Sequence, residues 1–195
     1  ARVIPYGEAR AIAEVLLELL EPACDRIEIA GPVRRETPTV SDVEIVAVPR
    51  YEGRAIPGQQ GLFAGPEQTE SVNLLWQRIG EVGEEGTRIL PIKPGTLEII
   101  PDPNWTAKRI AGSRYLRLYL PRPMVKVDLF LASPETWGPI MTIRTGSAVF
   151  SKLLVWHWTT LSAGGHFREG RIEDRDGKVL ESPEERDVFR ILKTA

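Results

Sequence analysis

The segment Val40–Val48 constrains the fold most, because it is apolar on both sides and yet carries two acids near its start. Apolar residues occupy both parities of this segment, and a strand of that kind usually lies in the middle of its sheet. Asp42 and Glu44 are two residues apart, so the alternation of side chains along a strand directs both carboxylates to one face. Two neighbouring carboxylates repel each other, and a divalent cation would relieve that cost.

A third acid, Asp128, lies within another apolar strand-like segment, 125–131. A lone carboxylate among apolar neighbours is unfavourable. Three carboxylates from two adjacent strands can hold two Mg²⁺ ions about 3.5–4 Å apart, the separation used in two-metal phosphoryl chemistry. Oxygen-only ligands favour magnesium over zinc, and we expect Mn²⁺ to substitute. Because the acids repel one another, we also expect the loss of Asp128 to leave the metal-free protein equally stable or more stable.

The residues before the acid pair favour phosphate binding. Gly31 follows a short predicted strand at 27–30 and precedes Arg34 and Arg35. Backbone amides at a glycine turn, together with arginines, form a cradle for a triphosphate. An acid pair two residues apart is most often only a solvated strand face. The order of strand, glycine turn, basic pair, acid pair and distant third acid is what makes the pattern specific.

These residues resemble the signature of the DNA polymerase beta family, or family X, of the nucleotidyltransferase superfamily. That signature is Gly-Ser, a variable residue and Arg-Arg, followed by Gly-Asp-x-Asp on a strand, and it is similar to residues 31–35 and 41–44. The Ile-Arg-Thr-Gly-Ser segment at 143–147 is similar to the family's Thr-Gly-Ser turn, and the tail from 167 to 189 resembles the family's thumb. The compact form most resembles copies encoded by phages.

The resemblance implies a role for each matching residue. The catalytic and metal-binding residues would be Asp42, Glu44 and Asp128. The nucleotide-binding residues would be Gly31, Arg34, Arg35, Ser41, Arg144, Thr145, Gly146 and Ser147. Lys126 matches a basic position that contacts the phosphate at the primer end.

The sequence departs from the family at several positions. Glu44 replaces an aspartate and reaches one methylene farther, and Pro32 replaces a serine that binds phosphate, so a hydroxyl donor is lost. The positions that help to read the nascent base pair hold small or apolar residues, namely Ala148, Ser151 and Val155, and Gly170 replaces an aromatic residue. These departures bear on fidelity more than on chemistry.

We predict an α+β fold with a nucleotidyltransferase palm over residues 1–145, built on a small mixed sheet with helices on one side. A small thumb-like β-hairpin and helix subdomain follows over 146–195. Helices are predicted from Pro5 to before Pro22, over 72–82, from 133 onward, over 147–158 and after Ser182. The other predictions are a surface loop at 49–69, an irregular hairpin within 83–108, paired strands at 115–120 and 125–131, and a hairpin turn at 176–177.

Charge and composition bear on the partners of the chain. The net charge is −2, whereas a protein that grips a nucleic-acid backbone usually carries a basic surplus. The family's N-terminal lyase and helix-hairpin-helix segments have no counterpart before Pro5, so we expect a weak unaided grip on DNA and a benefit from a DNA-binding protein partner. A group of cations surrounds the predicted hairpin and either tracks a phosphate backbone or forms a solvated face: Arg109, Arg114, Arg117, Arg122 and Lys126.

Three further expectations concern single features. The absence of a run of about 18 apolar residues and of a signal-like N-terminus, with one cysteine, indicates a cytoplasmic protein without a membrane segment. Cys24 is expected to be buried. Trp156, His157 and Trp158 could stack on a template base; the favoured expectation is that Trp156 packs, with His157 and Trp158 at the surface.

The sequence therefore predicts a template-dependent DNA polymerase of the beta type. It would add a deoxynucleoside monophosphate from Mg-dNTP to a primer 3′-hydroxyl, release pyrophosphate and extend distributively. One alternative is a nucleotidyltransferase that acts on an RNA end, a small molecule or a protein. A second is an inactive module that binds nucleotide or nucleic acid.

Overall fold

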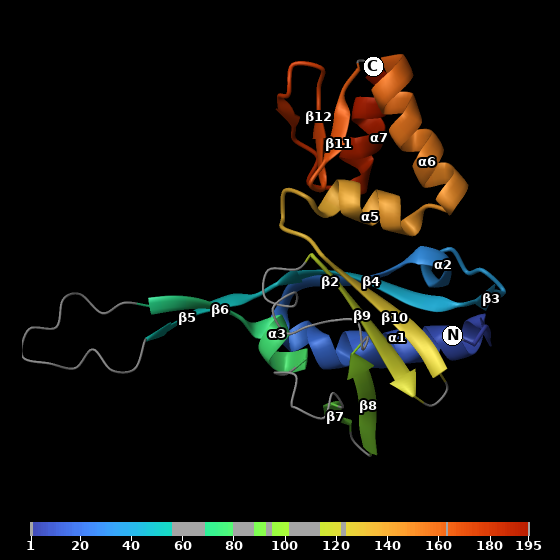
Figure 1. Cartoon of the computed structure of the whole chain (residues 1–195), viewed down its shortest axis with the longest axis vertical. Helices are drawn as coiled ribbons and strands as arrows, with labels where there is room; N and C mark the ends of the chain where they lie inside the picture. Colours follow the sequence, from blue (N-terminus) through green and yellow to red (C-terminus); the bar gives the residue numbers. More distant parts are fainter. Residues whose placement is uncertain are drawn as a thin grey trace, which may run out of the picture.

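Strand β4 (Asp42–Pro49) lies inside a six-stranded sheet, as its two apolar sides predict (Figure 1). The computed structural model of the protein describes residues 2–55, 69–79, 88–92, 95–101, 114–121, 124–162 and 164–194. β4 pairs antiparallel with β2 (Cys24–Ala30) and parallel with β10 (Met124–Leu131). The sheet order is β2-β4-β10-β9-β8-β7, so the sheet is mixed and the α+β class is confirmed.

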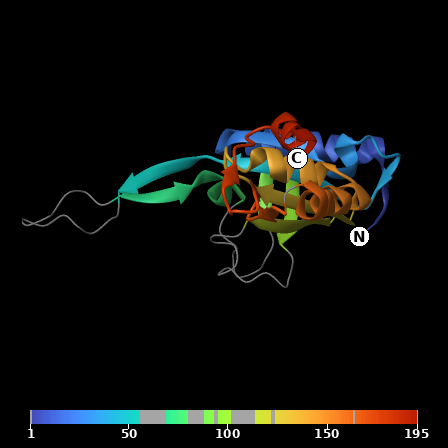
Figure 2. The ribbon, with the colours of Figure 1, turned by 90° about the horizontal axis from the view of Figure 1, so that it is seen from above.

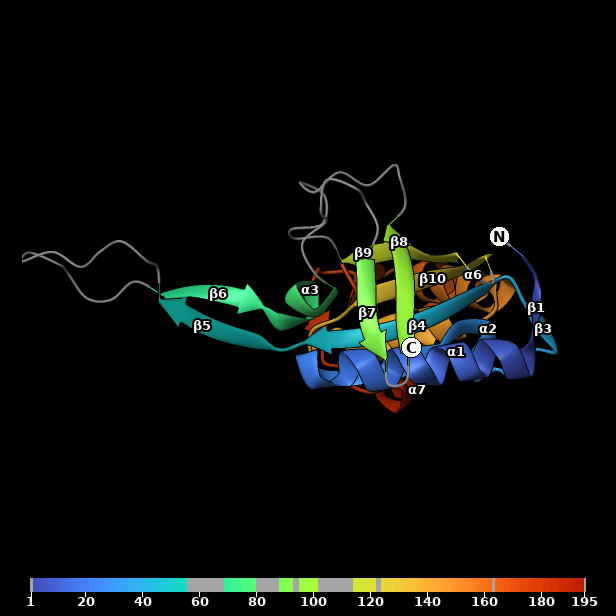
Figure 3. The same ribbon diagram turned by 90° about the horizontal axis from the view of Figure 1, so that it is seen from below.

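The remaining strands form the edge of this sheet and three small sheets. β9 (Tyr115–Pro121) pairs antiparallel with β10, as predicted, and β7 (Arg88–Ile92) and β8 (Gly95–Pro101) form a hairpin within the predicted region. β7 and β8 extend away from the C-terminal elements (Figures 1 and 3). The small sheets contain β1 (Ile4–Pro5) with β3 (Thr39–Val40), β5 (Tyr51–Ala55) with β6 (Thr69–Asn73), and β11 (His166–Arg168), β12 (Arg171–Glu173) and β13 (Val179–Leu180).

The helices follow the apolar spacing of the sequence closely at the N-terminus. α1 spans Tyr6–Leu20, buries Ala9, Ala13 and Leu16 on one side, and gives way to a 3₁₀ turn at Glu21–Ala23 because Pro22 cannot continue the helix. The other helices are α2 (Gly31–Arg34), α3 (Leu74–Ile79), α5 (Trp137–Thr145), α6 (Ala148–Trp156), a π-helical turn at His157–Ser162, and α7 (Glu185–Thr194). None of the helices in the described ranges is long and apolar enough to cross a membrane.

Helices cover both faces of the sheet, which corrects the prediction of helices on one side. The odd-numbered side chains of β4, including Val43 and Ile45, share a core with Leu16 of α1. The even-numbered Val46 shares a second core with Trp137 of α5. Both parities of β4 are apolar beyond Glu44, so each face needs its own cover, and Figure 1 shows α1 and α5 on opposite sides.

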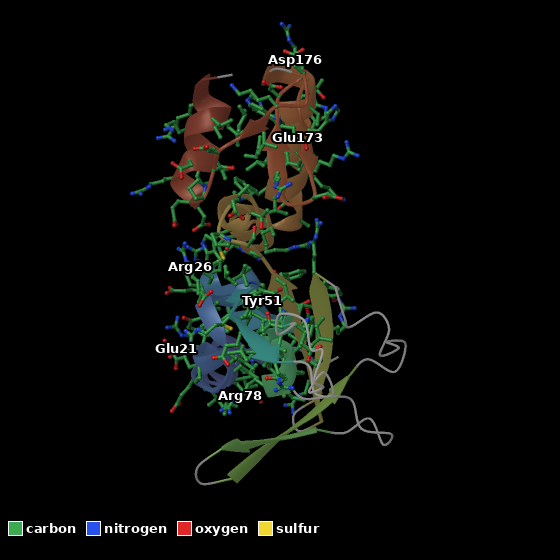
Figure 4. All side chains as sticks on the ribbon, turned by 90° about the vertical axis from the view of Figure 1, so that its left-hand side faces the viewer. Glu21, Arg26, Tyr51, Arg78, Glu173 and Asp176 are labelled. Carbon is green, nitrogen blue, oxygen red and sulfur yellow. The ribbon has the colours of Figure 1, made fainter. Side chains whose placement is uncertain are left out.

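The C-terminal elements surround a third core built on Trp158, Ile172 and Val188. α5 connects them to the sheet, because one side of α5 packs on β4 while Gly138 lies against the backbone just before α7. Arg26, labelled in Figure 4, reinforces the junction. Its guanidinium lies 4.0 Å above the Trp137 ring and pairs with Glu184 at 2.6 Å. The predicted boundary at 145/146 falls at the end of α5.

Several local predictions are confirmed. Ser147 caps α6 by accepting the Phe150 N–H at 3.1 Å. The turn at 176–177 joins β12 to β13, with Gly177 at φ +79° and the Asp174 carboxylate accepting the N–H groups of Asp176 and Lys178. Cys24 is buried.

Other local predictions are confirmed only in part. The predicted loop at 49–69 contains β5 and the start of β6, although residues 56–68 lie outside the described residues; this hairpin projects from the body (Figure 2). The helix predicted from residue 72 begins at Leu74 and ends at Ile79, with 80–82 outside the described residues. α5 begins at Trp137 rather than near Ser133, because the N–H of Ser133 is bonded to the Thr136 hydroxyl in a local turn.

Trp156 and Trp158 also differ from expectation, because the first is exposed and the second is buried. Trp156 is 52% exposed and Trp158 only 2%. Trp158 follows the buried Leu154 by four residues, so the two share a side of the helix. The Trp158 indole also donates to the carbonyl oxygen of Glu173 at 3.0 Å, which satisfies its buried N–H.

The close approach at Gly138 gives a stability prediction. A Cβ at residue 138 would collide with the backbone oxygen of Ser182 and lie 2.6 Å from that of Glu184. We expect Gly138→Ala to lower the free energy of unfolding by about 1–3 kcal/mol in urea denaturation. Gly7→Ala is the matched control, because a Cβ on that helical residue meets nothing within 4 Å, and it should stabilise by about 0.5–1 kcal/mol. Equal effects of the two substitutions would contradict this packing.

Candidate metal centre

The parallel register of β4 and β10 brings the three predicted acids together. Asp128 pairs with Glu44 across the two strands, and Lys126 pairs with Asp42. One carboxylate oxygen from each of Asp42, Glu44 and Asp128 lies within 4.8 Å of the others, so the three could hold a metal ion. The predicted convergence of the acids is therefore confirmed.

Two of the acids have cationic partners within hydrogen-bonding distance. Lys126 Nζ lies 2.9 Å from Asp42 Oδ2. Arg117 donates twice to Asp128, from Nε to Oδ1 at 2.7 Å and from Nη2 to Oδ2 at 3.0 Å, and the Tyr115 hydroxyl donates to Oδ1 at 2.8 Å. These contacts stabilise Asp128, whose residue is only 5% exposed. They favour a stability cost for the loss of Asp128, contrary to the expectation from repulsion alone, and that cost stays a prediction.

The third acid, Glu44, has a raised pKa in this cluster. Burial raises the pKa of Glu44 from its ordinary 4.5 to about 7, and the neighbouring charges of Asp42 and Asp128 add to the rise. Arg144 and Arg35 lower the pKa in part. Near neutral pH this carboxyl therefore titrates, and a cation that binds the ionised form must displace its proton.

The glycine turn lies directly against Glu44. Gly31 has φ +61°, a conformation that favours glycine, and a Cβ there would lie 2.7 Å from Glu44 Oε2. The predicted phosphate-binding turn and the predicted metal ligand are thus in contact. Arg35 follows this turn, and its charge acts on Glu44.

The two arginines connect the turn to the predicted nucleotide-binding segment of 144–147. Arg35 donates to the carbonyl oxygen of Thr145, and Arg34 donates to the Thr145 hydroxyl at 2.9 Å. Arg34 also makes a two-point ion pair with Glu185 of α7, at 2.9 and 2.6 Å. Arg34 therefore joins α2 to α7, a role for which neither residue gives a local sequence signal.

The other predicted residues surround this arrangement at different distances from the acids. The Arg144 guanidinium lies 4.0 Å above the Phe130 ring. Ser147 is exposed and used as the α6 cap, and Ser41 is exposed immediately before β4. A Cβ at Gly146 would collide with Phe150, which explains the need for glycine there.

Sequence reasoning did not assign Arg117 and Tyr115 to the site. Arg117 appeared only within the predicted basic group, of which Arg109 and Arg122 lie outside the described residues. Arg114 pairs with Glu169 at 3.3 Å, so the described members of the group all have acidic neighbours. The register of β9 and β10 would have located them: Pro121 pairs with Met124, and counting back from that pair places Arg117 opposite Asp128.

A cavity of about 250 Å³ is lined by residues that bond to the acids or act on their charge, and not by the acids themselves. It is lined by Tyr115, which bonds Asp128, and by Arg144, whose charge acts on Glu44. A second cavity of about 560 Å³ shares Arg114 and Glu169 with the first and extends toward Tyr51 and Trp76. The candidate centre therefore shares Tyr115 and Arg144 with a neighbouring cavity.

No model of a known protein family matches the chain. A search of curated proteins finds no match either.

The raised pKa of Glu44 gives a pH prediction. The folded, metal-free protein holds this proton more tightly than the unfolded chain, so the stabilisation is fully present below about pH 4.5 and is lost as the pH rises through about 7. With EDTA present, the melting temperature should fall between about pH 5 and pH 8 more steeply for the wild type than for Glu44→Gln. Glu52→Gln, an exposed acid on β5, is the control. Parallel profiles for wild type and Glu44→Gln would show that the pKa of Glu44 is not raised in the folded protein.

Asp128→Ala gives a second prediction, on stability alone. The substitution removes the shared acceptor of Arg117 and Tyr115, and we expect a loss of about 1–3 kcal/mol in metal-free unfolding. Asp25→Ala removes the exposed partner of Arg50, so its cost should stay below about 1 kcal/mol. An Asp128→Ala protein as stable as the wild type would restore the view that repulsion dominates the cluster.

Proposed function

We propose that the chain is a Mg²⁺-dependent nucleotidyltransferase of the DNA polymerase beta type, with a palm built on the six-stranded sheet. The observation that carries this proposal is the acid triad in contact with the Gly31 turn, with Arg35 and Arg144 acting on Glu44. An all-oxygen ligand set suits Mg²⁺, with Mn²⁺ as a substitute.

Asp42, Glu44 and Asp128 would hold two Mg²⁺ ions. Bound Mg²⁺ neutralises phosphate charge and favours ionisation of the attacking hydroxyl. In the transfer the acceptor oxygen forms a bond to the α-phosphorus, the bond to the bridging oxygen of pyrophosphate breaks, and the hydroxyl proton leaves to solvent. The chain would contribute position and charge neutralisation rather than a covalent intermediate.

In this proposal some residues around the acids contact the substrate, and others hold the site in place. The backbone at Gly31, with Arg35, Ser41 and Arg144, would contact the triphosphate. Thr145, Gly146 and Ser147 would lie on the sugar and base side. Arg34 would act as a positioning residue, because its ion pair with Glu185 and its bond to Thr145 hold the turn and α7 together.

Lys126 would serve the acceptor. Its ammonium pairs with Asp42 in the metal-free protein. If Asp42 held a cation, that pairing would weaken, and Lys126 would be available to a phosphate at the acceptor end. The preferred acceptor is the primer 3′-hydroxyl of a DNA template complex, extended distributively in the cytoplasm with a DNA-binding protein partner.

One observation favours the alternative of an acceptor other than duplex DNA. Arg114, Arg117 and Lys126, which were expected to track a phosphate backbone, are each paired with an acid. With a net charge of −2, little positive charge among the described residues of this group is left for a duplex. An RNA end, a small molecule or a protein hydroxyl would need less positive charge on the protein than a duplex does.

The test measures transfer of labelled nucleotides to gapped DNA, recessed primer, single strand and RNA. We expect Mg²⁺-dependent extension of the DNA primer and a loss of about a hundredfold or more for Asp128→Asn, since charge stabilisation by metal is worth several kcal/mol. Asp176→Asn, at an 80% exposed side chain, should retain full activity.

Three other results are informative. Activity that survives Asp128→Asn would refute the proposed centre. Transfer only to a non-DNA acceptor would favour the alternative acceptor. Nucleotide binding without any transfer would indicate an inactive module.

A further inference from the structure

The cations of α7 gather on the outward side of the helix. Arg186, Arg190 and Lys193 follow the i, i+4, i+7 spacing and are all exposed. Val188, on the other side, is fully buried in the core that contains Trp158. At a rise of about 1.5 Å per residue the three cations span about 10 Å, roughly the length of three stacked nucleotides.

An exposed aromatic ring lies among these cations. Phe189 is 42% exposed and lines a surface groove together with Arg186, Arg190 and Lys193. Its ring also contacts Phe150 of α6, with centroids 6.4 Å apart, which limits its freedom to rotate. A held aromatic ring beside cations offers both stacking and phosphate contacts.

The acids near this surface already have partners. Glu185 is engaged by Arg34, and Glu184, whose charge interacts with Arg186, is engaged by Arg26. Asp187 is 8% exposed, accepts the N–H of Glu184 and pairs with Arg190 at 3.0 Å, while the Arg190 side chain stays 72% exposed. Within 185–194 the acids are Glu185 and Asp187, so the outward side of α7 is locally basic on a chain of net charge −2.

We propose that the α7 groove, formed by Arg186, Phe189, Arg190 and Lys193, binds single-stranded nucleic acid, with phosphates on the three cations and a base stacked on Phe189. A single strand fits this surface better than a duplex, because its bases are open to stacking on a side chain. The groove uses neither the acids nor the cavities beside them. It therefore goes beyond the proposed transfer, and binding needs no metal.

The test is fluorescence anisotropy of a labelled oligothymidylate with EDTA present and no nucleotide. The triple substitution Arg186→Ala, Arg190→Ala and Lys193→Ala should weaken binding about tenfold or more. It should also lower the slope of log K against log salt by about 2, since each phosphate contact on a single strand contributes about 0.7. Phe189→Ala should weaken binding about fivefold or more with little change of slope, because stacking releases no counterions.

A matched control removes the same charges elsewhere among the C-terminal elements. Arg168, Arg175 and Lys178 are exposed on the β11–β13 sheet and its turn, and their triple alanine variant should bind within about twofold of the wild type. Equal losses in both triple variants, no loss in either, or tighter binding to duplex would overturn the proposal. So would sedimentation showing that wild type self-associates through Phe189 without binding the oligonucleotide. Failure of nucleotide transfer leaves this test intact, because the measurement involves no catalysis.

Discussion

The parallel pairing of β4 with β10 is the constraint on which the rest of the centre depends. Because the strands run in the same direction and in this register, Glu44 lies beside Asp128, and Asp42 lies beside Lys126. A shift by one residue would turn Asp128 to the opposite face of the sheet and place an apolar side chain beside Glu44. The two cores on either side of β4 fix the register, since each parity of the strand has its own apolar partners.

The charges of the centre are supplied by parts of the chain that are far apart in sequence. The acids come from β4 and β10, their cationic neighbours from β9 and β10, and Arg35 and Arg144 from segments on either side of the junction with the C-terminal elements. The ion pairs Arg34–Glu185 and Arg26–Glu184 cross the same junction. Movement of the C-terminal elements would therefore change the electrostatic surroundings of Glu44 as well as the shape of the site.

The sequence predicted those features that local rules decide. Period-two alternation located the acids, apolar parity placed β4 inside the sheet, and Ser147 marked the start of α6. Features decided by partners were missed. Glu185 gives no local sign that it binds an arginine 151 residues away. β5 and β6 are exposed along most of their length, so no alternation of apolar residues marks them. Tyr115 and Arg117 needed the register of β9 and β10, which the pairing of Pro121 with Met124 fixes but residue types alone do not.

Asp42 pairs with Lys126, and Asp128 pairs with Arg117. These ion pairs offset the charge of the acids, so the protein does not need a bound cation in order to fold. A divalent ion would enter by exchange, replacing an ammonium group and a proton, and the ion pairs that it disrupts would be subtracted from its affinity. Such a site would hold a metal loosely and exchange it quickly. The ion that occupies it would then follow the abundance of free divalent cations in the surroundings, rather than a selective grip by the protein.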